Sequence, residues 1–225
     1  MQHIKSLSQL WDKVLELNRK HFPDNALMPI VGGGRISNPK FMFIFINPTV
    51  RNISSNPDWS GFRAPFIGTK NIWRIFNRAG LFDNDLLQEV ENSPTSWSTD
   101  FAEKVYKHLE DQSFYFTNIV KWTGHNADLP NSEKAKLFLP ILKREIEIVQ
   151  PQHIVTFGLI PFNHLVGEKI KLIDYYSRLQ ETEEFQQFEK RIGERKFNII
   201  PCYFPVGRGD PKRAIEMLRM MNELL

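Results

Sequence analysis

Two asparagines and one phenylalanine stand close to the points where the sequence predicts that loops leave buried strands. Asn47 directly follows a run of six apolar residues, Phe66 lies in the long loop after it, and Asn118 belongs to a second apolar run. An aromatic ring stacks on a planar nucleobase, and a side-chain amide exchanges paired hydrogen bonds with the edge of the base. These residue types therefore favour binding of a flat heterocycle. The ordinary alternatives are an Asn-Pro turn at Asn47, a core position for Phe66 and a loop cap at Asn118.

A second candidate group follows the last predicted strand. Arg208, Lys212 and Arg213 stand at the start of the C-terminal helix, where cations can contact phosphates. Val206 is an apolar residue nearby that could wedge into a stack of bases. The alternative is that these charges simply form the solvated end of a helix.

Composition limits the classes of protein to consider. With 225 residues, 41% of them hydrophobic, the chain can bury one good-sized core, and we expect a single domain over residues 1–225. The single cysteine, Cys202, excludes an intramolecular disulfide and any metal or iron–sulfur site built on several thiolates, so we expect no cofactor. A net charge of +3 and a pI near 8.9 allow a polyanionic partner without requiring one.

Targeting signals are also lacking in the sequence. No apolar stretch approaches membrane-spanning length, and the N-terminus does not resemble a secretory signal. We therefore expect an intracellular monomer without membrane association, in the cytoplasm or nucleoid or, in a eukaryote, in the nucleus. The sequence also contains no nucleophile elbow, no His-Glu-x-x-His metal motif and no dinucleotide-binding glycine fingerprint.

The elements that must position these residues alternate between strands and helices. Apolar runs predict buried strands at residues 41–46, 114–120, 153–157 and 197–203. Amphipathic spacing predicts helices at residues 6–20, within an N-terminal helical segment 1–25, and at residues 69–79, 101–109, 132–149 and 211–224, with a bend near Pro140. Residues 174–195 are expected to form a charged helical insertion that is too polar to be core. The three glycines at residues 32–34 are expected to form a flexible connection.

This order predicts an α/β fold, a three-layer α/β/α sandwich around a mostly parallel sheet of about four strands. In such sheets the loops after the strands meet at the carboxyl rim, where ligands bind. We therefore expect Asn47, Phe66 and Asn118 to converge on one cavity there, together with residues 204–213.

Five short segments resemble motifs of one enzyme family, in the same order and at similar intervals. The segment Phe-Ile-Asn-Pro-Thr at 45–49 is similar to the first motif of a mismatch-specific branch. Pro-Phe-Ile-Gly at 65–68 and Thr-Asn-Ile-Val-Lys at 117–121 match motifs of a thermophilic branch, as do a long helix and strand over residues 138–158. Pro-Cys-Tyr-Phe-Pro-Val at 201–206 lies over the last motif. From about residue 40 to its end, the chain resembles the uracil-DNA glycosylase superfamily.

The resemblance implies a monofunctional DNA glycosylase of base-excision repair, which would hydrolyse the N-glycosidic bond of uracil or a related deaminated base flipped out of DNA. Asn47 and Pro48 would occupy the catalytic motif, with Asn47 orienting water. Phe66 would stack on the base and Asn118 would read its edge, while Phe204 occupies the base-binding position of the last motif.

Three departures from the family pattern leave alternatives open. Phe45 replaces a glycine, Phe204 replaces the histidine that hydrogen-bonds the base, and Cys202 alone cannot supply the four cysteines of the thermophilic cluster. One alternative is a catalytically weak or inactive member that binds nucleic acid or a base. Another is an unrelated small-molecule enzyme on the same scaffold, because fold alone does not determine function.

Overall fold

The computed structural model describes residues 3–94, 96–125, 129–207 and 209–224. Within those residues, six strands form one sheet in the order β1-β3-β2-β4-β6-β5. Its four central strands are mutually parallel: β3 (Phe114–Asn118), β2 (Phe41–Phe45), β4 (His153–Phe157) and β6 (Arg195–Cys202). Two antiparallel strands form the edges, β1 (Gly33–Gly34) and β5 (Phe188–Ile192). The predicted α/β fold with a mostly parallel sheet is confirmed, and the two edge strands enlarge it.

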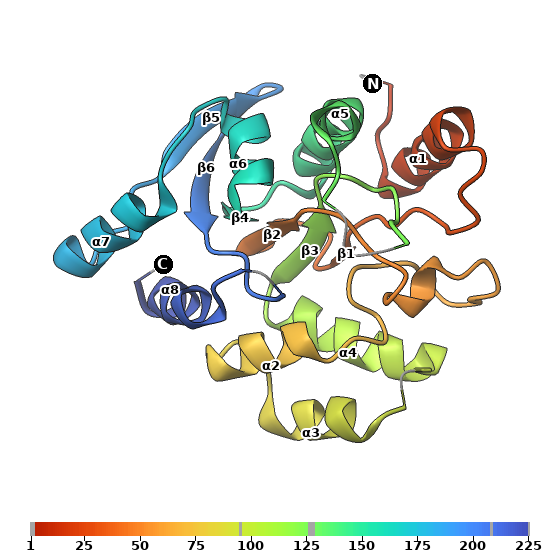
Figure 1. Ribbon diagram of the computed structural model, residues 1–225, viewed down its shortest axis with the longest axis horizontal. Helices are drawn as coiled ribbons and strands as arrows, with labels where there is room; N and C mark the ends of the chain where they lie inside the picture. Colours follow the sequence, from red (N-terminus) through yellow and green to blue (C-terminus); the bar gives the residue numbers. More distant parts are fainter. Residues whose placement is uncertain (1–2, 95, 126–128, 208, 225) are drawn as a thin grey trace.

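Helices cover both faces of the sheet (Figure 1). One face carries α1 (Leu7–His21), α5 (Ser132–Val149) and α6 (Leu159–Val166). The other face carries α2 (Asn71–Arg78), α3 (Asn84–Asn92), α4 (Thr99–Asp111), α7 (Leu172–Thr182) and α8 (Pro211–Leu224). A short 3₁₀ helix, Ile53–Ser55, lies in the loop after β2. None of the helices in the described ranges is long and apolar enough to cross a membrane.

Strand β2 explains why the central run is apolar throughout. All five of its residues are buried, and alternate side chains enter different cores. Phe41, Phe43 and Phe45 pack with the helices around α2 and α8, whereas Met42 and Ile44 pack with α1 and α5. A strand covered on both faces has no polar side, so it shows no alternation in sequence.

The three glycines at 32–34 are not a flexible connection. Gly33 and Gly34 pair with β3, and a Cβ at Gly32 would lie 2.4 Å from the ring of Tyr115. Gly34 has φ of +105°, and a Cβ there would lie 2.3 Å from the main-chain oxygen of Phe114. Close backbone packing therefore requires these glycines, and the expectation of flexibility was wrong.

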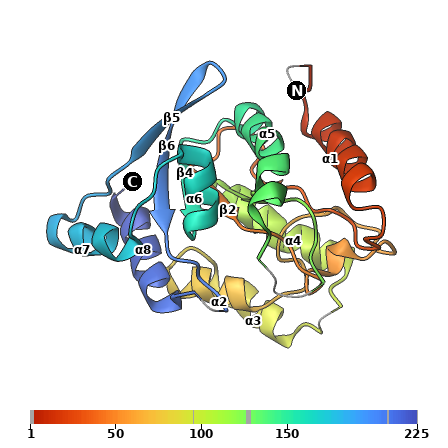
Figure 2. The same cartoon turned by 45° about the horizontal axis from the view of Figure 1, so that its top comes forward.

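The expected helical insertion at 174–195 is only partly helical. Helix α7 ends at Thr182, and residues 188–192 form edge strand β5, which pairs with β6 as a hairpin (Figure 2). Tyr175 and Leu179 are buried in the core, with 6% and 1% exposure, so the segment is not purely a surface addition. Strand β5 alternates exposed residues with half-buried or buried ones, as an edge strand with one solvated face does.

The helix ends follow the expected capping chemistry. The Asn131 side chain accepts a hydrogen bond from Lys134 N at the start of α5, and the Asp210 side chain accepts one from Arg213 N at the start of α8. Helix α5 continues through Pro140 as one element, so the predicted bend does not interrupt it. Helices α3 and α6 were not predicted.

Candidate functional site

The parallel pairing of β2 with β3 places the motifs at 45–49 and 117–121 side by side. Phe45 and Asn118 are register partners, and Ile119 N and Val120 N donate to the oxygens of Phe45 and Ile46 at 2.9 and 3.0 Å. The pairing resumes further along, where Gly124 N donates to the oxygen of Pro48 at 3.0 Å. The segments that carry Asn47 and Asn118 therefore leave the sheet together at its carboxyl rim.

Asn118 carries an unpaired buried amide. Its side chain is 1% exposed, and by strand alternation it shares a face with Phe116. The Nδ2 group finds no hydrogen-bond partner among the residues that the structure describes. An unsatisfied buried donor costs about 1–3 kcal/mol, so a group in this state is poised for an acceptor that a ligand can bring.

Phe66 lies against the same end of the sheet. Its ring is 4.6 Å from the Phe45 ring and 6.3 Å from the Phe116 ring, in edge-to-face arrangements. Its φ of 66° is unusual for a bulky residue, and the turn is held because Thr69 donates to the Phe66 oxygen from both N and Oγ1, at 3.1 and 2.8 Å. The structure thus links Phe66 to β3 and β2 through the rings of Phe45 and Phe116.

Asn47 is half-buried in a rigid turn. Its Nδ2 donates to the Pro48 oxygen at 3.0 Å, the same oxygen that receives Gly124 N. Pro48 itself is buried. With the amide nitrogen engaged, the Asn47 side-chain oxygen is the atom left to accept a hydrogen bond from water, and no described residue donates to it.

Phe204 brings the last motif to this rim. A Cβ at Gly158, just after β4, would lie 3.7 Å from the Phe204 Cβ and 3.9 Å from the Ile46 Cδ1, so the segments after β2, β4 and β6 meet. Phe204 is half-buried, and its main-chain oxygen accepts from Asp210 N at 3.0 Å. Its phenyl ring offers no hydrogen-bond donor to a ligand.

The predicted DNA-contacting residues lie in different environments. Val206 is half-buried and packs against the core, Lys212 is exposed, and Arg208 lies outside the described residues. Arg213 forms an ion pair with Asp210 at 3.0 Å, and its guanidinium carbon lies 5.4 and 5.5 Å from the rings of Tyr176 and Tyr203. Lys212, unlike Arg213, therefore has no ion-pair partner within the described ranges.

Two features at this rim were not predicted from the sequence. Val50 is 48% exposed and Arg51 is exposed, at a turn held by hydrogen bonds from Val50 N to the Gly124 oxygen and from Asn52 N to the Thr49 oxygen, both 2.9 Å. The other feature is a buried ion pair between Lys121 and Glu145 beneath Asn118. No local pattern marks an exposed valine or a contact between residues far apart in the chain.

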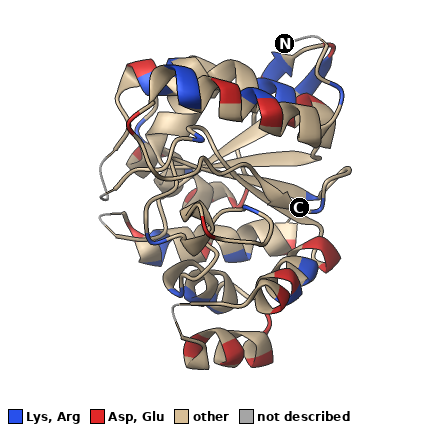
Figure 3. Ribbon diagram, turned by 90° about the vertical axis from the view of Figure 1, so that its right-hand side faces the viewer, with Lys and Arg blue, Asp and Glu red and all other residues tan. Residues whose placement is uncertain are grey.

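Charge is dispersed over the rest of the molecule. Figure 3 shows lysine and arginine interspersed with aspartate and glutamate over the helices, and acidic residues colour the helix at the bottom of the view, α3. Among the described residues in this view, such mixing gives no broad field of one sign, so electrostatic attraction of a polyanion would depend on cations near the rim, such as Arg51 and Lys212.

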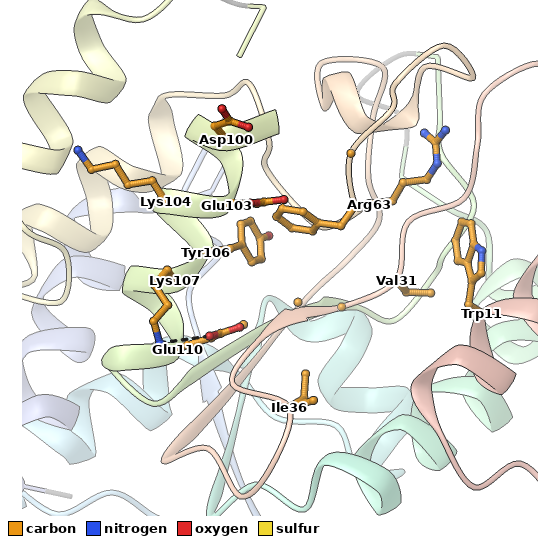
Figure 4. A pocket seen from close by; sticks show the side chains of 15 residues that line it. Trp11, Val31, Ile36, Arg63, Asp100, Glu103, Lys104, Tyr106, Lys107 and Glu110 are labelled. Carbon is orange, nitrogen blue, oxygen red and sulfur yellow. Dashed lines mark ion pairs between the residues drawn. The ribbon is translucent and has the colours of Figure 1, made fainter. Parts of the chain in front are cut away.

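One cavity lies away from these residues. It encloses about 920 Å³ between β1 and α4, and none of the predicted site residues lines it (Figure 4). Two of its cations are already engaged: Arg63 donates to the oxygens of Asn56, Pro57 and Trp59, and Lys107 pairs with Asp111. The motif residues, not this cavity, identify the candidate site.

Cys202 does not fit a metal-cluster role. It is fully buried at the end of β6, and burial raises the pKa of its thiol well above the ordinary value. A single buried thiol cannot provide the four thiolates of an iron–sulfur cluster.

Comparison with known families gives one result for this chain. The family model described as "Uracil DNA glycosylase superfamily" matches residues 31–224, which include the whole sheet and every segment of the rim and leave α1 outside. No individual curated protein matches significantly. Because the match covers most of the sequence, the chain belongs to the uracil DNA glycosylase superfamily.

Proposed function

We propose that this protein is a monofunctional DNA glycosylase that hydrolyses the N-glycosidic bond of uracil or a related deaminated base, acting as a monomer inside the cell. The observation that carries the proposal is the buried Asn118 amide with its unpaired Nδ2, located at the strand end next to the rings that hold Phe66. A flipped base entering this site would supply the missing acceptor.

The site residues divide recognition between stacking and edge reading. The Phe66 ring would stack on the flipped base. The Asn118 side-chain oxygen would accept from the ring N–H of uracil, and its Nδ2 would donate to O4. Cytosine presents a donor where uracil has O4 and an acceptor where uracil has its N–H, so a fixed amide would leave groups unpaired against cytosine.

Asn47 would act on the water. In hydrolysis a water oxygen bonds to C1′, the bond from C1′ to the base nitrogen breaks, and its electron pair leaves with the base. The base then takes up a proton, and the water gives one up to solvent. An amide is no strong base, but the free Asn47 oxygen can orient the water toward the oxocarbenium-like sugar.

DNA would approach over the rim that carries Arg51 and Lys212. Both side chains are exposed and could meet phosphates, and the exposed Val50 stands between the catalytic motif and Arg51. Val206, the end of the last motif, and Arg208 after it remain candidate contacts, with Val206 as a wedge in the base stack.

A second candidate function is supported by Phe204. Where the family has a histidine that hydrogen-bonds the base, this chain has a half-buried phenyl ring with no donor. Loss of one preorganised donor costs about 3–4 kcal/mol in comparable sites, so the remaining residues could bind a base while cleaving it slowly or not at all.

The proposal is tested on a panel of DNA duplexes that contain uracil, hypoxanthine, xanthine or a thymine mismatch. Abasic-site formation is scored for each duplex under single-turnover conditions. We expect slow excision of at least one deaminated base. Binding of these duplexes without abasic sites from any of them would favour the binding-only function.

A further inference from the structure

Lys121 and Glu145 form an ion pair with no solvent exposure on either side chain. Lys121 lies three residues after Asn118, and Glu145 is on α5, which covers that face of the sheet. Burial lowers the pKa of Lys121, and the Glu145 carboxylate opposes that shift. Neither residue lies at the surface of the rim, so neither can touch DNA directly.

Every hydrogen-bonding capacity of the lysine is used. Its Nζ donates to Thr117 Oγ1 at 2.5 Å, to the main-chain oxygen of Asn118 at 2.8 Å and to Glu145 Oε2. An ammonium group has three donors, so none remains.

The Glu145 carboxylate also accepts hydrogen bonds from residues other than Lys121. It accepts from Tyr115 OH at 2.9 Å, from Thr117 Oγ1 at 3.0 Å and from Gly32 N at 3.1 Å. The network therefore ties α5, the glycine edge and β3 to one point below Asn118. The network engages the main-chain oxygen of Asn118 but not its side chain, whose Nδ2 finds no partner among the described residues.

Such a pair is not needed for stability alone. Removing two charges from water is costly, and well-packed neutral replacements of buried ion pairs are often as stable as the pair. The contact that sets this pair apart is the one to the main chain of Asn118, the residue assigned to read the base.

We propose that Lys121 and Glu145 are positioning residues, which hold the backbone of Asn118 so that its amide meets the edge of the flipped base in one fixed orientation. This inference rests on the proposed function. It predicts that loosening the network impairs recognition and turnover without unfolding the protein, because a displacement of about 1 Å at a reacting site costs on the order of 100-fold in rate.

The main test is the double variant Lys121→Met/Glu145→Gln. It removes both charges, keeps an acceptor for Tyr115 and Gly32, and loses the donor to the Asn118 oxygen. The matched control is Arg144→Met/Glu147→Gln, which neutralises an ion pair at 2.9 Å on the same helix with 21% and 27% exposure. Excision of uracil is followed as kcat and KM separately, with the thermal midpoint of each protein as the measure of folding.

We expect kcat for uracil to fall by roughly 100-fold in the double variant and to stay near the wild-type value in the control. A folded double variant with wild-type kcat, or with the same loss as the control, would overturn the inference. Thr117→Val serves as the second variant if the double variant does not fold. It removes the hydroxyl between Lys121 and Glu145 and should also lower kcat, and an unchanged kcat in this variant would equally refute positioning.

A binding measurement separates this inference from the proposed function. Fluorescence anisotropy compares duplexes that carry uracil or cytosine at the same site. If the wild-type protein excises no base but binds the uracil duplex more tightly than the cytosine duplex, the glycosylase proposal fails. The positioning role of Lys121 and Glu145 then predicts that the double variant binds both duplexes equally. If the wild-type protein neither excises nor prefers uracil, both proposals fall.

Discussion

Phe45 and Asn118 face each other as register partners on β2 and β3, and the Phe45 ring lies 4.6 Å from that of Phe66. The pairing of β2 with β3 therefore fixes how the motifs that carry Asn47, Phe66 and Asn118 lie relative to one another. Asn47 follows Phe45 by two residues, so it leaves the sheet beside the strand end that bears Asn118.

Asn47→Ala should reduce turnover and leave DNA binding nearly unchanged. The side-chain oxygen would orient water, which matters chiefly in the transition state, so we expect kcat to fall by about 100- to 1,000-fold. Single-turnover excision and binding of an uncleavable uracil analogue measure the two effects. Asn198→Ala is the control, because Asn198 is exposed and pairs in register with His153 at the opposite end of the sheet. Equal losses in binding and turnover would contradict this role.

Asn118→Asp should weaken recognition of uracil. The carboxylate keeps its acceptors but loses the donor to O4, and an unpaired group costs about 1–3 kcal/mol. We expect kcat/KM for uracil to fall by roughly 5- to 150-fold, with a smaller effect on affinity for undamaged duplex. Competition between uracil-containing and undamaged duplexes measures how strongly the variant prefers uracil. A variant that selects uracil as well as the wild type would remove Asn118 from recognition.

Phe204→His should increase excision. The imidazole supplies the donor that the phenyl ring lacks, and one preorganised donor is worth on the order of 100- to 1,000-fold in kcat. Phe204→Leu is the matched control, since it changes the ring without adding a donor and should give no gain. If the histidine variant is folded and no faster than the leucine variant, this position does not limit the chemistry.

Lys212→Ala should flatten the salt dependence of DNA binding by about one unit in the slope of log K against log salt concentration. Arg213→Ala should change the slope less, because the Arg213 guanidinium is already paired with Asp210. Lys107→Ala, on α4 and paired with Asp111, is the control. Unchanged affinity in a variant with alanine at Arg208, Lys212 and Arg213 would rule out these three cations as phosphate contacts.

Acidification should destabilise the fold through His108. Burial lowers the pKa of His108, with Asp83 and Asp111 opposing the shift, and Asp83 N donates to its Nε2 at 3.4 Å. The unfolded chain then binds more protons near the ordinary histidine pKa of about 6.5, so stability falls as pH falls through that value and levels off below the folded-state pKa. Urea midpoints measured from about pH 8 to about pH 5 should drop less in His108→Gln than in the wild type. The same drop in both proteins would contradict this assignment.

The central strands could be predicted because each contains a short run rich in apolar residues. A strand buried on both faces, such as β2, is apolar at every position and can be recognised from its own residues. The edge strands carry a much weaker signal: β1 is two glycines, and β5 has three consecutive charged residues between Phe188 and Ile192, which resembles a polar helix surface. Tertiary pairing, not local sequence, makes these segments strands.

The candidate site was likewise only partly predictable. Asn47, Phe66 and Asn118 could be selected because each lies near a strand end and has chemistry suited to a flat base. The partners of these residues could not be read from the chain. Lys121 meets Glu145, the Phe45 ring meets that of Phe66, and Gly158 approaches Phe204, each across the fold between segments that no local pattern connects.

The most direct test of the central claim is a single-turnover assay of wild-type protein and Asn47→Ala on one uracil-containing duplex, with abasic sites quantified by alkaline cleavage. The account predicts slow abasic-site formation by the wild type, its loss in Asn47→Ala, and similar binding of an uncleavable duplex by both. Wild-type protein that binds the duplex without producing abasic sites, or an Asn47→Ala protein that excises uracil at the wild-type rate, would contradict it.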